Sequence, residues 1–303
     1  MEMELRQLKY FVKTAETLNF SEAARQLFVT QSTLSQQIRQ LEQELGVELF
    51  LRDSHSVRLT ESGEHLLPGA RRTLQEADSC FAQVSDLKQM LTGVLNIGIT
   101  YSFAPVLAES VREFTRQYPG VKLNIVCRNM TEILDLLKRR EVDFVLCFKP
   151  SVLDDDIESH TLFDTHLAVI VGRGHPLADR TSLTPEDLRP YALALPAKET
   201  QARNIFDLCY PGATSALRVA VEINEVHVLL DLVRATRLVT VLSENVLYRT
   251  EALKAIPFDA PGTQMEGCVH TLKKTYRKRA VDEFIRILSQ SDAVMERAHK
   301  WLK

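Results

Sequence analysis

The chain has 303 residues, of which 45% are hydrophobic and 25% are charged, and its net charge is −3. At roughly 150 residues per domain this length predicts about two domains, and the apolar content excludes both a disordered chain and a fibrous one. The apolar runs are about one strand long, whereas a membrane-spanning helix needs about 20 apolar residues, so a membrane protein is excluded as well.

Cysteine usage and the N-terminal residues predict a cytoplasmic protein. The five cysteines are scattered, odd in number and without CxxC spacing. This pattern favours reduced thiols over a disulfide framework or a zinc site. Residues 1–4 are acidic and begin no apolar signal core, so secretion is not expected.

The first 92 residues have helical patterns throughout. An amphipathic helix is predicted over residues 4–20, and Ser21 is predicted to cap a second, short helix over 22–27. Small side chains at 23 and 24 allow the next helix to approach closely, which predicts a helix-turn-helix. The residues expected to face inward from the first helix are Leu5, Leu8, Phe11, Val12, Ala15 and Leu18.

The third predicted helix covers residues 31–45, with Thr30 as its cap and Gly46 at its end. One face is apolar, whereas the opposite face carries amides, hydroxyls and one arginine, with no acid before Glu42. Ordinary solvated faces mix Lys and Glu, so this composition favours contact with base edges in the major groove of DNA. The candidate DNA contacts on this helix are Gln31, Ser32, Thr33, Ser35, Gln36 and Arg39.

A short hairpin, or wing, is predicted after this helix. Residues 49–52 and 57–60 flank a polar turn, and Arg52 and Arg58 are candidates for phosphate contacts, which position a protein rather than specify a sequence. The alternative is that both are plain surface arginines. Charge alone gives no support for DNA binding, because residues 1–60 hold seven Lys and Arg against eight Asp and Glu.

A long helix is predicted over residues 60–91, with Thr60 as its N-cap and Pro68 expected to kink or split it. Its apolar stripe either packs on its own domain or pairs with a second subunit. We favour the second, because the helix is longer than a head of about 60 residues can cover. The stripe consists of Leu66, Leu67, Ala70, Leu74, Ala77, Phe81, Val84, Leu87 and Leu91.

From Gly93 onward, β-branched runs alternate with helical segments, which predicts βαβ units and a largely parallel sheet. The expected strands lie at 94–99, 121–126, 142–148, 167–171, 217–223 and 238–242, and the expected helices at 104–118, 131–140, 226–235 and 280–289.

Several motifs in the first 63 residues resemble, in order, the head of the LysR-type transcriptional regulators. They are 8–11 (LKYF), 20–24 (FSEAA), 27–42 (LFVTQSTLSQQIRQLE), 44–52 (ELGVELFLR) and 59–63 (LTESG). Two further runs, 93–98 (GVLNIG) and 174–177 (GHPL), resemble the family's effector domain, so the resemblance covers the whole chain. Within the family, residues 234–243 (RATRLVTVLS) are similar to the cyanate-operon regulator subgroup.

The resemblance implies an α/β fold with a winged helix-turn-helix, a linker helix and a two-lobed effector domain similar to periplasmic binding proteins. It implies a homodimer through the linker helix, often a tetramer, and places base contacts on Gln31, Ser32, Ser35 and Gln36. The sequence departs from the family pattern at Ser32 and Ser243, where Pro is frequent, and at His55, where many members have a wing arginine. The implied domains are 1–60 (head), 61–92 (linker) and 93–303 (effector domain), the last with lobe I at 93–163 and 268–303 and lobe II at 164–267.

The effector site is predicted where the strands of both lobes end, because ligands of open α/β sheets bind outside the carboxyl ends of strands. Each candidate residue has an alternative role as a helix cap, but their convergence on one cleft favours a site. Hydroxyls and helix N-termini predict an anionic or polar effector. The candidates are Thr100, Ser102, Asn129, Thr131, Lys149 at the expected hinge with Pro150, Thr200 and Glu225.

Other classes of function fit the sequence less well. A solute-binding protein would leave the first 92 residues unexplained, and an enzyme would need a catalytic constellation such as a nucleophile elbow, HExxH or a Walker loop, none of which occurs. We therefore expect no enzyme, no cofactor and no metal. A redox sensor would use reactive cysteines, but Cys127 and Cys147 fall in or beside strands, which favours buried, inert thiols. The basic run 273–279 is expected to be a solvated connection.

Overall fold

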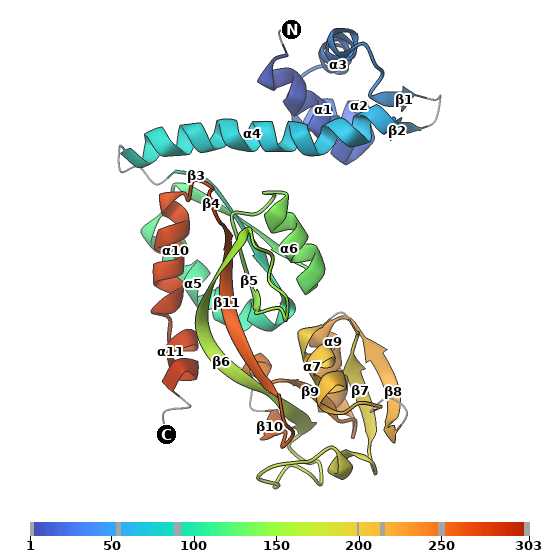
Figure 1. The fold of residues 1–303 in the computed structure, drawn as a ribbon, viewed down its shortest axis with the longest axis vertical. Helices are drawn as coiled ribbons and strands as arrows, with labels where there is room; N and C mark the ends of the chain where they lie inside the picture. The colour runs from blue at the N-terminus through green and yellow to red at the C-terminus, as the bar shows by residue number, and fades with distance from the viewer. Residues whose placement is uncertain are drawn as a thin grey trace. The chain divides into compact units, whose positions relative to one another are not determined.

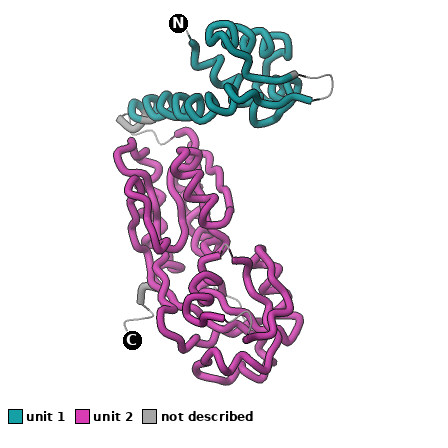
Figure 2. Tube along the Cα trace, turned by 45° about the vertical axis from the view of Figure 1, so that its right-hand side comes forward, with its two compact units in different colours: residues 1–88 teal, residues 89–303 magenta. Residues whose placement is uncertain are grey.

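The computed structural model of the chain describes residues 3–52, 56–87, 92–198, 200–212, 216–247 and 252–299. They form two compact units, residues 1–88 and residues 89–303, which Figure 2 distinguishes by colour.

The first unit is a winged helix-turn-helix followed by a long helix (Figure 1). Its core joins all three short helices to the wing through buried residues such as Phe11, Leu34 and Phe50. The third helix has the bounds that the sequence predicted, because a threonine cap and a glycine stop are local signals. The elements are α1 (Leu5–Thr17), α2 (Phe20–Gln26), α3 (Gln31–Leu45), β1 (Phe50–Arg52), β2 (Val57–Leu59) and α4 (Glu61–Leu87).

Several predictions for the first two helices were wrong. Helix α1 ends at Thr17 because Leu18 adopts a left-handed conformation with φ 48°, and Leu5 and Leu18 are exposed rather than inward. Helix α2 is capped not by Ser21 but by Asn19, whose side chain accepts a hydrogen bond from the backbone N–H of Glu22. This earlier cap lengthens α2 by the two residues that precede its expected start.

Helix α4 runs without interruption through Pro68, so the expected split does not occur. A proline removes one backbone hydrogen bond, and here the residues around it, Leu66, Leu67 and Ala70, are anchored in the core of the first unit. The far half of the stripe is different, since Phe81 is 76% exposed and Val84 is 55% exposed. Residues 88–91, including Leu91 of the predicted stripe, lie outside the described residues.

The second unit begins with three parallel strands covered on both faces (Figure 1). Alternate residues of one of these strands, β5, divide between two clusters: Phe144 and Leu146 pack with α5 and α10, whereas Val145 and Cys147 pack with α6. This part therefore has the three layers of a βαβ architecture. Its elements are β3 (Gly93–Ile99), α5 (Ala104–Gln117), β4 (Val121–Cys127), α6 (Met130–Lys138), β5 (Phe144–Phe148), α10 (Arg279–Ser289) and α11 (Asp292–His299).

Two long antiparallel strands connect the lobes and make the sheet mixed rather than largely parallel. Strand β6 (Ile157–Gly172) pairs with β11 (Gln264–Leu272) through its first part and with β9 and β10 through its last part. The strand order is β10-β6-β11-β5-β3-β4, with β9 beside β6. Only the apolar end of β6 was predicted, because polar residues dominate its first half.

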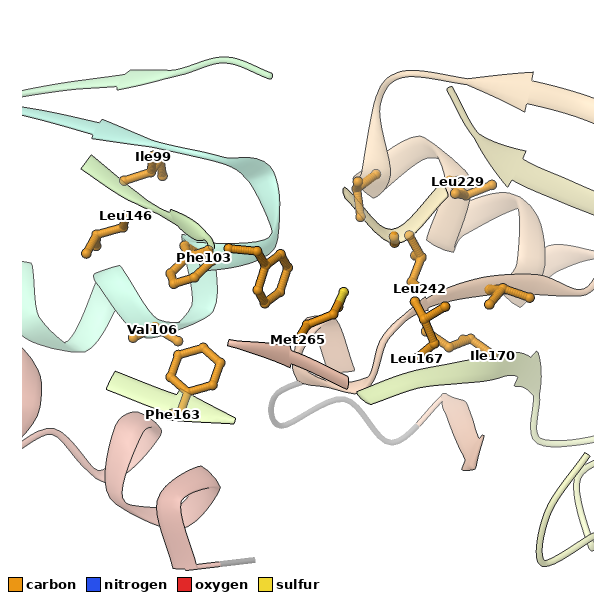
Figure 3. Packing of buried hydrophobic residues seen from close by; sticks show 14 of the residues in the cluster. Ile99, Phe103, Val106, Leu146, Phe163, Leu167, Ile170, Leu229, Leu242 and Met265 are labelled. Atoms are coloured by element: carbon orange, nitrogen blue, oxygen red, sulfur yellow. The ribbon is translucent and has the colours of Figure 1, made fainter. Parts of the chain in front are cut away.

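The described residues of the other lobe include a parallel strand pair and the helices α7 and α9. Its elements are β7 (Ala192–Pro196), α7 (Gln201–Cys209), β8 (Arg218–Ile223), α9 (Val226–Ala235), β9 (Thr240–Ser243) and β10 (Leu253–Pro257). One apolar cluster spans both lobes. Figure 3 shows Met265 of β11 between Phe103 on one side and Leu242 and Leu167 on the other. The two lobes thus share a continuous core along the connecting strands.

Candidate functional site

Helix α3 separates an apolar face from a polar one. Thr30 begins the helix by accepting a hydrogen bond from the backbone N–H of Thr33 at 3.2 Å. Leu34, Ile38 and Leu41 are fully buried. The opposite residues, which include Ser32, Gln36 and Arg39, are exposed.

The polar side chains at the start of α3 are partly held by neighbours. Ser21 of α2 donates a hydrogen bond to Gln31 Oε1 at 3.1 Å, which orients that amide and leaves its N–H groups free to donate outward. The Thr30 hydroxyl lies 2.9 Å from that of Ser32. Within the described part of the chain, Ser35, Gln36 and Arg39 make no side-chain hydrogen bond or ion pair. Their polar groups are therefore available to an external partner.

The wing follows α3 as an antiparallel hairpin in which Leu51 pairs with Arg58. Arg58 is exposed on β2, and Arg52 is the last residue of β1. His55, where the family pattern has an arginine, lies outside the described residues. The backbone thus places Arg52 at the end of β1 and Arg58 one pair further along the hairpin.

A cavity of about 250 Å³ lies where strand ends of the two lobes face each other. Most of its walls come from the residues after β3 and β4 and the last residue of β5 in one lobe, and from the residues after β7 and β8 in the other, as the carboxyl-end rule predicts. The residues from the first lobe are Thr100, Tyr101, Ser102, Arg128, Asn129, Met130, Glu132 and Phe148. Those from the second are Ala197, Thr200, Gln201, Ala202, Asn224, Val226 and Leu242.

Thr100 differs from the other candidates in the cavity region. Asn129, Thr200 and Glu225 each cap a helix by accepting a hydrogen bond from a backbone N–H in its first turn. The Thr100 side chain caps nothing, and its buried hydroxyl oxygen has no hydrogen-bond partner among the residues described. A buried hydroxyl without a partner costs free energy, so this group is poised for a partner that enters the cavity.

Three of the seven predicted effector residues do not line the cavity. Thr131 is exposed on the first turn of α6, where the helical rotation turns it away from Asn129 and Glu132. The Lys149 ammonium lies 3.0 Å from both carboxylate oxygens of Glu266. Glu225 caps α9. The cavity therefore brings together Thr100, Ser102, Asn129 and Thr200.

Two charged residues of the cavity were missed by the sequence interpretation. Arg128 immediately follows β4, so the carboxyl-end rule applies to it as well as to Asn129. Its Nη1 donates to the carbonyl of Cys127 at 2.8 Å, and its Nε lies 3.7 Å from Glu132 Oε2. Glu132 also accepts a hydrogen bond from Asn129 Nδ2 at 3.0 Å. Among the described residues, the wall thus carries one charge of each sign.

Burial raises the pKa of two further groups near the cavity. It is the main cause of the raised pKa of the Tyr101 phenol, with the charges of Cys127 and Glu225 adding to it. Burial also raises the pKa of the Cys127 thiol to about 11. Both groups are protonated at neutral pH, so the Cys127 sulfur is a poor nucleophile. Burial likewise raises the pKa of Cys147, which is fully buried.

Membrane-spanning helices and metal-binding clusters are both absent from the described residues. None of their helices is long and apolar enough to span a membrane. They also contain no group of three or more His, Cys, Asp or Glu side chains arranged to hold a metal ion.

Two family models together match nearly the whole chain. Residues 5–64 match the bacterial regulatory helix-turn-helix protein, lysR family, and residues 88–293 match the LysR substrate binding domain. The chain therefore belongs to the LysR-type transcriptional regulators, which combine a DNA-binding head with an effector-binding domain. The α/β fold with a winged helix-turn-helix, a long helix and two lobes is confirmed as well.

Individual relatives agree with this assignment. The HTH-type transcriptional regulator YnfL of Escherichia coli K12 is 35% identical over 190 residues, which are 62% of this chain and 64% of that protein. The match thus spans less than two thirds of that relative. Full-length OxyR from Pseudomonas aeruginosa, solved as a cysteine-to-aspartate variant, is 25% identical, with a TM-score of 0.75 and 97% of each chain covered. The fold is also that of full-length CbnR complexed with target DNA, with a TM-score of 0.68, 22% identity and coverage of 94% and 99%.

Proposed function

We propose that this chain binds operator DNA through α3 and changes that binding when a small polar effector occupies the cavity between its lobes. The proposal of DNA binding rests on the polar face of α3. On this face the side chains of Ser35, Gln36 and Arg39 have no partner among the described residues. Amides and guanidinium groups make bidentate bonds to purine edges in the major groove. CbnR, which has the same fold, was solved in complex with its target DNA.

The proposed DNA contacts divide into two kinds. Gln31, Ser32, Thr33, Ser35, Gln36 and Arg39 contact base edges or nearby phosphates, since they lie on or beside the N-terminal half of α3. Arg52 and Arg58 of the wing contact phosphates, which fix the register of the head without reading the sequence.

We further propose that the chain associates through α4 into a homodimer or into a tetramer of such dimers. The exposed Phe81 and Val84 support it, because large apolar side chains are left uncovered on the half of α4 that extends beyond the core of the first unit. The proposed domains are the head at 1–60, the linker at 61–92 and the effector domain at 93–303, with lobe I at 93–163 and 268–303 and lobe II at 164–267. Within the family we propose, on residues 234–243 alone, a likeness to the cyanate-operon regulator subgroup.

The proposed effector contacts are Thr100, Ser102, Asn129 and Thr200. The free hydroxyl of Thr100 gives the strongest support, and the cavity size suits a small molecule. Thr131, Lys149 and Glu225, which the sequence also indicated, would act indirectly, through the α6 terminus, the Glu266 ion pair and the α9 cap.

The test of base reading compares Gln36→Ala with Gln43→Ala. Both remove an exposed amide from the same face of α3, but only Gln36 lies in the N-terminal half, which enters the groove. Loss of a bidentate base contact costs about 1–3 kcal/mol, so Gln36→Ala should lower the ratio of specific to non-specific affinity about 5- to 150-fold. Gln43→Ala should leave that ratio unchanged, and Arg58→Ala should weaken both affinities together. An unchanged ratio in Gln36→Ala would show that α3 does not read bases.

A further inference from the structure

The described residues that line the cavity between the lobes include one positive and one negative side chain. Among its lining residues, Arg128 and Glu132 are the charged ones. The ion pair between these two side chains is loose, because Arg128 Nε and Glu132 Oε2 are 3.7 Å apart and each side chain is 56% exposed. That separation is longer than a hydrogen bond, so both charged groups can take a further partner.

Neighbouring groups add to both the positive and the negative electrostatic potential in the cavity. The first residues of α6 and α7, Met130 and Gln201, line the cavity, and a helix N-terminus carries partial positive charge. On the negative side, Glu225 is close enough to Tyr101 to raise the pKa of that phenol. A simple anion would therefore meet the repulsion of the acids, and a simple cation that of Arg128 and the helix ends. A ligand with both charges matches the site better than either.

We infer that the effector is a small zwitterion, an α-amino acid with an apolar side chain; this inference rests on the proposed effector function of the cavity. Its carboxylate would be bound by Arg128 and the free hydroxyl of Thr100, and its ammonium group by Glu132. The apolar side chain would lie against Phe148, Val226 and Leu242.

The cavity volume limits the size of this amino acid. The volume of about 250 Å³ is several times the roughly 30 Å³ that one water molecule occupies in the liquid, so the cavity has room for a small molecule. Valine, leucine, isoleucine and methionine are small amino acids with the apolar side chain that the site requires.

The test titrates the full-length chain with L-valine, L-leucine, L-isoleucine and L-methionine in a calorimeter. Each is compared with its 2-oxo acid, which lacks the ammonium group, and with its decarboxylated amine, which lacks the carboxylate. At least one amino acid should bind at one site per chain. Its two analogues should bind about tenfold more weakly or worse, because each leaves one charged group of the cavity unpaired.

Two charge-neutralising variants show which cavity side chain binds which charged group of the ligand. Glu132→Gln should lower the affinity for the amino acid about tenfold, and it should leave the affinity for the 2-oxo acid unchanged or raise it. Arg128→Gln should lower the affinities for the amino acid and for the 2-oxo acid, but not the affinity for the amine. Asp135→Asn is the matched control, since it neutralises an exposed acid of α6 that does not line the cavity. This variant should leave the affinities for the amino acid, the 2-oxo acid and the amine unchanged.

Three outcomes would overturn the inference: no binding by any of the four amino acids, unchanged amino-acid affinity in Glu132→Gln, or tighter binding of the 2-oxo acids. Tighter binding of a 2-oxo acid that Thr100→Val abolishes would still leave an effector cavity, with an anion as its ligand. Operator binding by the same preparations reports separately on the proposed function of the head.

Discussion

Thr100 and Thr200 have the same side chain and line the same cavity, but they do different things there. The Thr200 hydroxyl caps α7, accepting from the backbone N–H of Arg203 and donating to the carbonyl of Ala197 at 2.9 Å. The Thr100 hydroxyl has no partner in the part of the chain that the structure describes. Loss of a cap costs about 1 kcal/mol, so Thr200→Val should lower the free energy of unfolding by about that amount. Thr100→Val should leave it unchanged or slightly raise it, as urea titration would show. Equal destabilisation by both variants would contradict a free hydroxyl at Thr100.

Phe28 combines full exposure with an unfavourable backbone. It follows α2 in the left-handed conformation, with φ 55°, and its side chain is 96% exposed. The Val29 N–H donates to the carbonyl of Ala24 at 3.0 Å, which closes the helix-ending motif that usually has glycine or asparagine at this position. Phe28→Asn should therefore stabilise the chain by about 0.5–1 kcal/mol. Phe28→Ala removes the same ring but keeps the strain, so it should give no gain. A loss of stability in Phe28→Asn would contradict this account.

His270 makes stability depend on pH. It is fully buried beside Ser159, 2.6 Å from its hydroxyl, and burial lowers the pKa of the imidazole to about 4. Because this value lies below the ordinary 6.5, the unfolded chain binds a proton that the folded chain does not, and stability falls as the pH drops from about 6.5 to 4. The loss between pH 7 and pH 5 should be about 2 kcal/mol. His270→Gln should lose that part of the pH dependence in urea titrations, and an unchanged dependence would contradict it.

At the residue scale, the sequence predicts which positions carry polar groups at strand ends, but not the direction of each side chain. Thr100, Asn129 and Thr200 were predicted from the carboxyl-end rule and do line the cavity. Thr131 and Glu132 are adjacent on α6, and only the acid points into the cavity. That choice depends on how α6 is rotated against the sheet, which long-range packing determines.

At the scale of elements, helix α4 has two halves with different surroundings. Leu66, Leu67 and Leu74 pack on the core of the first unit, whereas Phe81 and Val84 are exposed. A charge at Leu74 would disturb folding as well as association, so Phe81→Glu is the cleaner variant. We expect it to convert the proposed dimer into a monomer, which sedimentation equilibrium would detect.

The control for this prediction is Gln83→Glu, which adds the same charge at an exposed position roughly 200° around the helix from Phe81. It should keep the wild-type mass. A wild type that sediments as a monomer, or a Phe81→Glu variant that remains a dimer, would show that α4 does not mediate association.

Elements with local signals were predicted well, and those defined by distant partners were not. Helix α3 has a cap, a periodic apolar face and a glycine stop within its own residues, and its bounds were predicted in full. Strand β6 extends over Ile157–Gly172 because β11, β9 and β10 pair with successive parts of it. Such pairing leaves little trace in a polar segment such as 158–161, so the mixed sheet could not be read from the sequence.

At the scale of the whole molecule, the chain joins a unit proposed to read DNA to a unit proposed to bind a ligand. An effector can change operator affinity only by as much as it prefers one arrangement of the chain over another. The usual coupling is about 1–3 kcal/mol, and it is reciprocal. If an amino acid raises operator affinity tenfold, operator DNA should raise the affinity for that amino acid tenfold as well. Calorimetry with and without operator tests this equality, and unequal factors would exclude a simple two-state coupling.

The most direct test of the central claim is a footprint of the full-length chain on the DNA upstream of its own gene. Two heads related by two-fold symmetry should protect two halves of an imperfect inverted repeat, with centres about 10 bp apart or a multiple of that spacing. Gln36→Ala should lose this protection at a concentration at which Gln43→Ala keeps it. Equal protection by the two variants, or no protected sequence anywhere in the upstream DNA, would contradict the claim that α3 reads operator DNA.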